Sequence, residues 1–137
     1  MPSAKKGPHE AAATARGLKY QIEADAEFLR VTMSGRETDE PPSDVCAVVF
    51  RESRRLGRNR ILIELDHQKA LSPTSQLMLV RGLPEVGFTP DDRIALVHRT
   101  EAMQRANEVI NLMASSRGVN VRNFPSAEAA KDWLRSQ

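Results

Sequence analysis

Three side chains suited to acid–base chemistry and one serine lie at the ends of two apolar runs. Asp66 and His67 follow one apolar run directly, Ser72 comes five residues after His67, and His98 follows the second run. Serine, histidine and aspartate form the triad of many hydrolases, and histidines with a carboxylate can bind a metal ion. A small hydrolase or metal-dependent enzyme using Asp66, His67 and His98 is therefore one hypothesis.

The spacing of these residues argues against both kinds of enzyme. Asp66, His67 and Ser72 are so close in sequence that triad geometry is disfavoured, and no Gly-x-Ser-x-Gly elbow occurs. No His-x-x-x-His or Cys-x-x-Cys pair sets a fixed metal-ligand spacing, and there is no glycine-rich phosphate loop. The sequence therefore predicts no catalytic residue, no metal site and no cofactor.

The residues after His67 are typical of a helix start. Ser72 can cap free N–H groups, and Pro73 suits the first helical position because it has no N–H group of its own. Such a terminus attracts phosphate or carboxylate, and a phosphate added to a hydroxyl there is stabilised by the helix dipole, although self-capping explains the same residues. The candidates for ligand binding or phosphorylation are Asp66, His67, Lys69, Ser72, Thr74, Ser75 and His98.

Length, composition and charge narrow the class of protein. The chain has 137 residues, of which 40% are hydrophobic and 28% charged, as expected of one globular domain. A net charge of +2 and 4% aromatic residues are too low for a dedicated nucleic-acid binder. No apolar run approaches the roughly 20 residues that span a bilayer. Cys46, the single cysteine, fits a reducing compartment. We expect a cytoplasmic protein with neither a nucleic-acid partner nor membrane insertion.

Strands and helices are predicted to alternate along one domain. Residues 1–17 have no apolar stripe and are expected to form a mobile tail before a domain that covers 18–137. Alternating polarity across 19–34 predicts a hairpin with one wet face. Apolar runs or alternation near 61–65, 94–97 and 119–122 predict three more strands.

Four helices are expected between and after these strands. Their predicted starts are within 41–44, at Ser72, at Thr100 and at Ser126. The helix that begins at Ser72 is expected to run for about three turns, because Gly82 and Pro84 limit it. The element order favours an α/β fold, with a mostly parallel five-stranded sheet whose first strand is antiparallel. The polar second face of several strands indicates that part of the sheet is open to solvent or covered by a subunit.

The C-terminal segment RGVNVRNFPSAEAAKDWL resembles the SpoIIAA-like group of the STAS superfamily. This group comprises small α/β domains related to anti-sigma-factor antagonists and, more distantly, to Sec14-type lipid-binding domains. The resemblance covers roughly Leu18 to Gln137 in element order. The residues that carry it are Gly118, Phe124, Ser126, Ala130, Trp133 and Leu134. They are packing residues, so they point to the fold more than to an activity.

The resemblance also implies a position for a regulatory site. The antagonists have a phosphorylatable serine within Asp-Ser-Ser-Gly-Leu, at the start of the helix after the central strand. This chain has DHQKALSPTSQL there, so the motif is absent and the turn is longer, and Ser72, Thr74 or Ser75 fills the place by position.

Taken together, these observations favour a non-catalytic regulatory or ligand-binding module. It is expected to act through protein contacts or a small anionic ligand at the start of the Ser72 helix. The enzyme that uses Asp66, His67 and His98 is the first alternative. The second is a homodimer formed through the less-covered face of the sheet.

Overall fold

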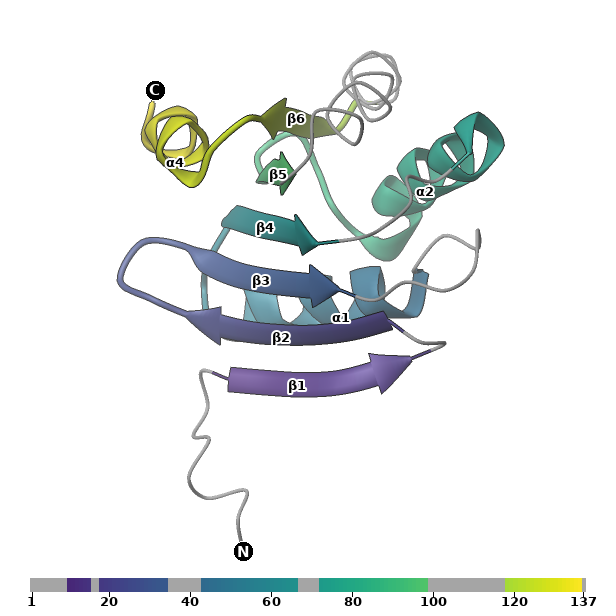
Figure 1. The fold of residues 1–137 in the computed structure, drawn as a ribbon, viewed down its shortest axis with the longest axis horizontal. Coiled ribbons are helices and arrows are strands. Elements are labelled where there is room, and N and C mark those ends of the chain that lie inside the picture. Colours follow the sequence, from purple (N-terminus) through teal and green to yellow (C-terminus); the bar gives the residue numbers. More distant parts are fainter. Residues whose placement is uncertain (1–9, 16–17, 35–42, 67–71, 99–117, 137) are drawn as a thin grey trace, which may run out of the picture.

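A computed structural model describes residues 10–15, 18–34, 43–66, 72–98 and 118–136. Six strands form one sheet in the order β1-β2-β3-β4-β5-β6 (Figure 1). The strands are β1 (Glu10–Ala15), β2 (Leu18–Ala24), β3 (Leu29–Ser34), β4 (Arg60–Asp66), β5 (Arg93–His98) and β6 (Asn120–Phe124). The described helices are α1 (Ser43–Arg55), α2 (Pro73–Val86) and α4 (Ala127–Arg135). None of these helices is long and apolar enough to span a bilayer.

The sheet is antiparallel at one side and parallel over the rest. β2 pairs antiparallel with β3, which confirms the hairpin predicted across 19–34. It also pairs antiparallel with β1. The pairs from β3 to β6 are all parallel. The mostly parallel α/β sheet predicted from the sequence is therefore confirmed. Because β3 to β6 run the same way, their carboxyl ends meet at one edge of the sheet, which we call the carboxyl edge.

Two predictions about the elements were wrong, and a third falls outside the described part. The expected mobile tail, residues 1–17, contains β1, so the sheet has six strands instead of five. This alanine-rich segment has no alternation of apolar and polar residues, and backbone pairing with β2 holds it in the sheet. α2 continues through Gly82 and Pro84 to Val86, and Gly87 caps it with a φ of 129°. The helix predicted to begin at Thr100 lies outside the described residues.

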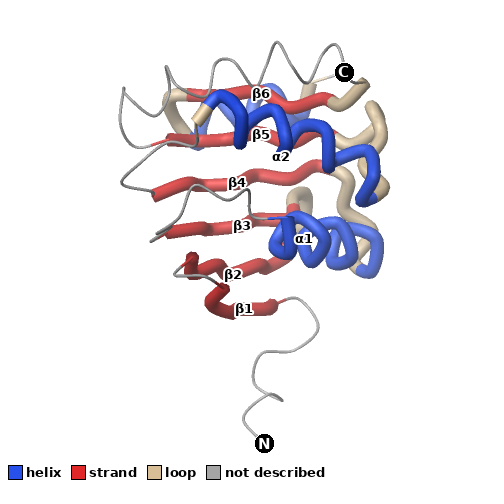
Figure 2. The backbone as a smooth tube through the Cα atoms, turned by 90° about the vertical axis from the view of Figure 1, so that its right-hand side faces the viewer, coloured by secondary structure: helices blue, strands red, loops and turns tan. Residues whose placement is uncertain are grey.

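The helices lie on both faces of the sheet. α1 and α2 lie on one face and α4 on the other (Figure 2). The larger core forms beneath α1 and α2, from side chains such as Val31, Ile63, Leu96, Val49 and Val80. The smaller core joins Leu62 and Ala95 to Ala130 and Leu134 of α4. We call these two sides the α1/α2 face and the α4 face.

The α4 helix packs on β4, β5 and β6. It has nine residues, which correspond to a length of about 14 Å. Its C-terminal end is held at the amino ends of β4 and β5, because Arg60 donates to the Leu134 carbonyl at 3.0 Å and Arg93 to the Trp133 carbonyl at 2.8 Å. On the same face, Val97 and Phe124 pack against the α4 core, whereas Thr32 and Asp66 are exposed.

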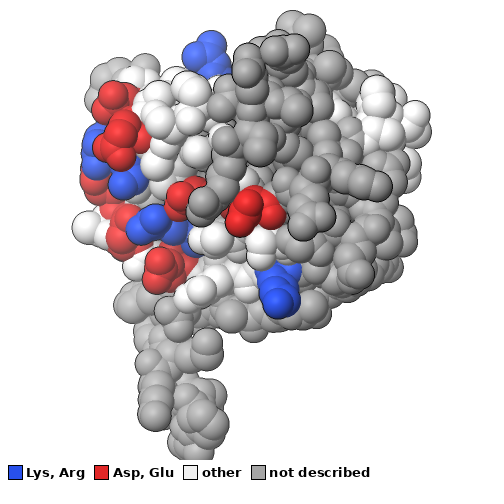
Figure 3. Space-filling model, viewed as in Figure 1, with Lys and Arg blue, Asp and Glu red and all other residues white. Residues whose placement is uncertain are grey.

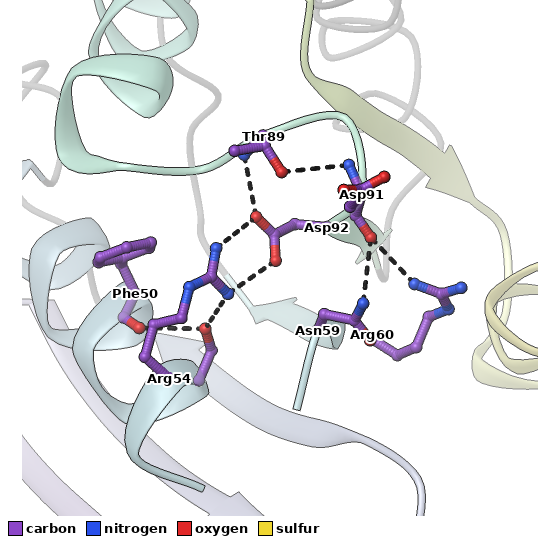
Figure 4. A network of polar contacts seen from close by, with 8 residues as sticks. Phe50, Arg54, Asn59, Arg60, Thr89, Asp91 and Asp92 are labelled. Carbon is purple, nitrogen blue, oxygen red and sulfur yellow. Dashed lines mark hydrogen bonds and ion pairs between the residues drawn. The ribbon is translucent and has the colours of Figure 1, made fainter. Parts of the chain in front are cut away.

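An ion pair joins α1 to the loop before β5 (Figure 4). Arg54 donates to both carboxylate oxygens of Asp92 at 2.8 Å, and the Thr89 backbone N–H donates to Asp92 Oδ2 at 2.9 Å. Asp92 is 2% exposed. Burial alone would raise the pKa of Asp92, but the hydrogen bonds from Arg54 and Thr89 outweigh it, so the pKa lies below its ordinary value. The pair therefore stabilises the fold in its ionised form.

Acidic and basic side chains also gather at the edge that carries the β2–β3 turn and α4, on the left of Figures 1 and 3. One of these contacts is the exposed pair of Arg135 and Glu27, at 3.0 Å. Exposed pairs of this kind contribute little to stability. The Arg135–Glu27 pair therefore provides a control for the buried pair.

We predict that Asp92→Asn lowers the free energy of unfolding at pH 7 by about 1.5–3 kcal/mol, the range for hydrogen bonds to charged groups. Because the folded-state pKa of Asp92 is depressed, its contribution is present above the ordinary carboxyl pKa and is lost as pH falls through the folded value. The gap between wild type and variant should thus shrink in acid. Urea titrations across pH measure it, and Glu27→Gln should change little. A gap that is constant with pH would contradict this account.

Two glycines of α2 and its cap provide a matched test of backbone packing. At Gly87 an added Cβ would collide with the Phe50 ring, and the φ of 129° disfavours any side chain. At Gly82 nothing lies within 4 Å of an added Cβ. Gly87→Ala should therefore destabilise the protein by roughly 1–3 kcal/mol, whereas Gly82→Ala should stabilise it by about 0.5–1 kcal/mol. Thermal melts would decide, and equal effects of the two changes would refute the packing argument.

Candidate functional site

Ser72 caps α2 as its sequence predicts. Its Oγ accepts the Ser75 backbone N–H at 3.3 Å, and its carbonyl accepts the Gln76 N–H at 2.9 Å. Pro73 has no N–H group to offer. Of the first helical residues, therefore, Thr74 is left to present its N–H to an external anion. Self-capping accounts for most of this terminus.

The three candidate hydroxyls differ in their accessibility. Ser75 is buried, at 6% exposure, and Ser72 is half-buried in its capping role. Thr74 is exposed in the first turn of α2. A phosphate is strongly charged, so it is most readily accommodated where water can reach it. Among the three, Thr74 is the position best suited to modification.

Asp66 and His98 lie on opposite faces of the sheet. In β4, Asp66 shares a face with Glu64, on the α4 side of the sheet. In β5, His98 alternates with Val97 and shares its side with the core residue Leu96. Alternation thus places the two side chains on opposite faces, although both residues line the pocket at the ends of β4 and β5. His67 and Lys69 lie outside the described residues.

His98 is a buried polar residue of the α1/α2 face. It is 1% exposed, and its Nε2 lies 2.9 Å from Asn123 Oδ1 of β6. Burial lowers the pKa of His98, although the hydrogen bond to Asn123 acts in the opposite direction. The imidazole is therefore held neutral near pH 7. Among the described residues, no group of three His, Cys, Asp or Glu side chains could hold a metal ion.

A pocket of about 380 Å³ opens at the carboxyl edge of the sheet. A row of paired residues runs across four strands beside it: Thr32 is in register with Glu64, Glu64 with Val97, and Val97 with Phe124. In the next row Ser34 is in register with Asp66. The pocket is lined by Thr32, Glu64, Leu65, Asp66, Val97, His98 and Pro125.

Sequence reasoning named Asp66 and His98, which both line this pocket, but missed Thr32 and Glu64. Glu64 interrupts the run Ile61 to Leu65, and period-two alternation places it on the same face as Asp66. That interruption was the available signal. Thr32 gave no comparable signal, because its position beside Glu64 depends on the register between β3 and β4.

Cys46 is the remaining nucleophilic side chain of the described part. It is half-buried and not in a disulfide. Burial raises the pKa of its thiol to about 12. A thiol with so high a pKa is a weak nucleophile at neutral pH. Cys46 therefore behaves as a small packing residue of α1.

Comparison with known proteins yields one structural similarity. No family model and no curated protein sequence match the chain. The chain is similar to an uncharacterised protein of the DUF3478 family with a SpoIIAA-like fold from Shewanella loihica PV-4. The two share 17% identity with a TM-score of 0.45, over 90% of this chain and 98% of that chain.

The buried imidazole leads to a prediction about pH. The folded-state pKa of His98 is lowered from its ordinary value of 6.5, so the unfolded chain takes up this proton first as pH falls. Stability should therefore decline below pH 6.5, by at most about 1.4 kcal/mol per pH unit. His98→Gln, which keeps a polar group near Asn123, should lack this decline. Urea titrations above and below pH 6.5 measure the difference, and identical profiles would exclude His98 as the cause.

Proposed function

We propose that the chain is a non-catalytic regulatory module that binds a partner protein through the exposed face of α2. The observation that carries this proposal is Met78. It is 57% exposed and is the one large hydrophobic side chain so exposed within the described residues. Large apolar side chains at a surface are a common feature of the centre of protein interfaces.

The neighbours of Met78 on α2 support an interaction surface. Thr74, Arg81 and Glu85 are exposed. Thr74 lies four residues before Met78, and the other two lie three and seven residues after it, so the four share one side of the helix. The opposite side is buried at Val80 and Leu83. An apolar centre within a polar and charged rim is the usual arrangement of a protein-binding patch.

Thr74 provides a possible control of this surface. It lies one helical turn before Met78 and is exposed in the first turn of α2. A phosphate there would be stabilised by the helix dipole while placing negative charge beside the methionine. Addition of that charge would change which partner the surface accepts. Thr74 is therefore the position that we propose for the phosphorylation expected from the SpoIIAA-like resemblance.

The other hypotheses receive less support from the same contacts. A small anionic ligand at the helix start would compete with the hydrogen bonds that Ser75 and Gln76 make to Ser72. The hydrolase would need Asp66 and His98 to converge, and they lie on opposite faces. A homodimer formed through the less-covered face of the sheet is the remaining alternative. Sedimentation would reveal it as a dimer that changes at Met78 of α2 leave intact.

A charge placed on α2 tests the proposal. Met78→Lys should weaken binding of a partner recovered with the tagged full-length chain from its host by at least about tenfold, ~1.4 kcal/mol, because an ammonium would replace an apolar anchor. Ala47→Lys introduces the same group at an exposed position of α1 and should bind as wild type. Calorimetry with the purified partner gives both affinities. Equal affinity of the two variants would refute the α2 surface.

The proposed effect of a phosphate on Thr74 is tested in the same assay by a charged substitution. Thr74→Glu should alter the partner affinity, whereas Thr74→Ala should bind as wild type. The melting temperature of Thr74→Glu should stay level or rise, since a carboxylate at a helix start contributes about 0.3–1 kcal/mol. Intact-mass analysis of protein from the host would show whether Thr74 carries a phosphate. A phosphate found on Ser72 or Ser75 instead would contradict the accessibility argument.

A further inference from the structure

We propose that the partner of the α2 surface is a second copy of the chain, bound through an antiparallel pair of α2 helices. This pairing rests on the proposed function, because it names the partner of the same surface. It differs from a dimer through the face of the sheet, because α2 alone makes the contact. Figure 2 shows α2 in front of the sheet, and none of the other described elements covers its outer side.

A glycine of α2 leaves room for a second helix. Gly82 is half-buried, and nothing lies within 4 Å of the position that a Cβ would take there. Met78 lies one helical turn before Gly82 and is 57% exposed. Two helices pack closely where the side chains of one fit into the gaps of the other. A helix that crosses α2 at Gly82 would therefore cover Met78 as well.

Two exposed charges beside Gly82 support a second α2 as the crossing helix. Arg81 and Glu85 are both exposed, and they lie four residues apart on α2. The ion pairs found among the described residues involve other side chains. A helix of the same sequence offers the same two charges. Each charge on one copy can therefore be complemented by the opposite charge on the other.

An antiparallel orientation brings these opposite charges together. With a two-fold axis between Arg81 and Gly82, Arg81 of each copy lies about 4.5 Å along the helix axis from Glu85 of the other, the rise of three residues. The axis repeats each contact, so the dimer contains two such ion pairs. A parallel pair would instead place Arg81 opposite Arg81 and Glu85 opposite Glu85. Like charges so placed are unfavourable, so the antiparallel pair is the one that fits.

The small size of the contact implies a weak dimer. α2 has 14 residues, and its inner side is buried at Val80 and Leu83. One helix face per copy falls below the total area of about 1,200–2,000 Å² that stable complexes bury. We therefore expect a dissociation constant on the order of 100 μM. The chain should be monomeric when dilute and dimeric when concentrated.

Sedimentation equilibrium of the purified full-length chain, from about 10 μM to about 1 mM, tests this pairing. The wild type should shift from monomer to dimer over this range. Arg81→Glu and Glu85→Arg each place like charges opposite one another, so each variant alone should associate at least about tenfold more weakly. An equimolar mixture of the two variants should form a dimer again, because their α2 helices then carry opposite charges. Recovery in the mixture would also show that both variants are folded.

A charge reversal on another helix provides the control. Glu128→Arg changes an exposed residue of α4 and should dimerise as the wild type does. A wild type that stays monomeric at about 1 mM, a dimer unaffected by Arg81→Glu, or a mixture of the two α2 variants that stays monomeric would each overturn the pairing. The assay of Met78→Lys with a partner from the host would still decide whether α2 binds another protein. The two proposals can therefore fail separately.

Discussion

The ion pair between Arg54 and Asp92 fixes the relation between α1 and the parallel strands. Asp92 immediately precedes β5, and its buried carboxylate is satisfied from both α1 and its own loop. The backbone N–H of the next residue, Arg93, donates to the Asn59 carbonyl at 2.9 Å, which aligns the starts of β4 and β5. Parallel register then follows: Arg60 pairs with Arg93, so Glu64 must pair with Val97. The positions of Glu64 and Val97 beside the pocket are therefore fixed by contacts at the amino ends of the same strands.

Contacts at the amino ends of β4 and β5 also hold α4 against the sheet. The guanidinium of Arg93 donates to carbonyls at the end of α4 and lies 5.5 Å from the centre of the Trp133 ring. Arg122 lies 5.7 Å from the same ring. These contacts hold a short helix over Leu62 and Ala95. Glu64, Asp66 and Val97, toward the carboxyl ends of β4 and β5, line the pocket.

Much of the fold was predictable because its signals are local. The Ser72 and Ser126 caps, the 19–34 hairpin and the apolar strands each depend on neighbouring residues, and each is present. β1 was missed because its stabilisation is backbone pairing with β2, which leaves no apolar pattern in the sequence. The site was only partly predictable for a similar reason. Because residues two apart in a strand share a face, the sequence alone shows that Glu64 and Asp66 lie on the same side of the sheet. The position of Thr32 beside Glu64, and that of His98 on the other face, depend on how different strands align.

The distribution of arginines explains why the two edges of the sheet differ in character. Near the amino ends of β4 and β5, Arg54, Arg58, Arg60 and Arg93 all donate to carboxylates or carbonyls of the fold. Their positive charge is therefore engaged in structural contacts and is poorly placed to recruit an anionic partner. At the carboxyl edge the described pocket is lined by carboxylates without a basic residue. Glu64 beside this pocket is itself paired with Arg30 of β3 at 3.0 Å, so a basic side chain is engaged within the fold at this edge as well.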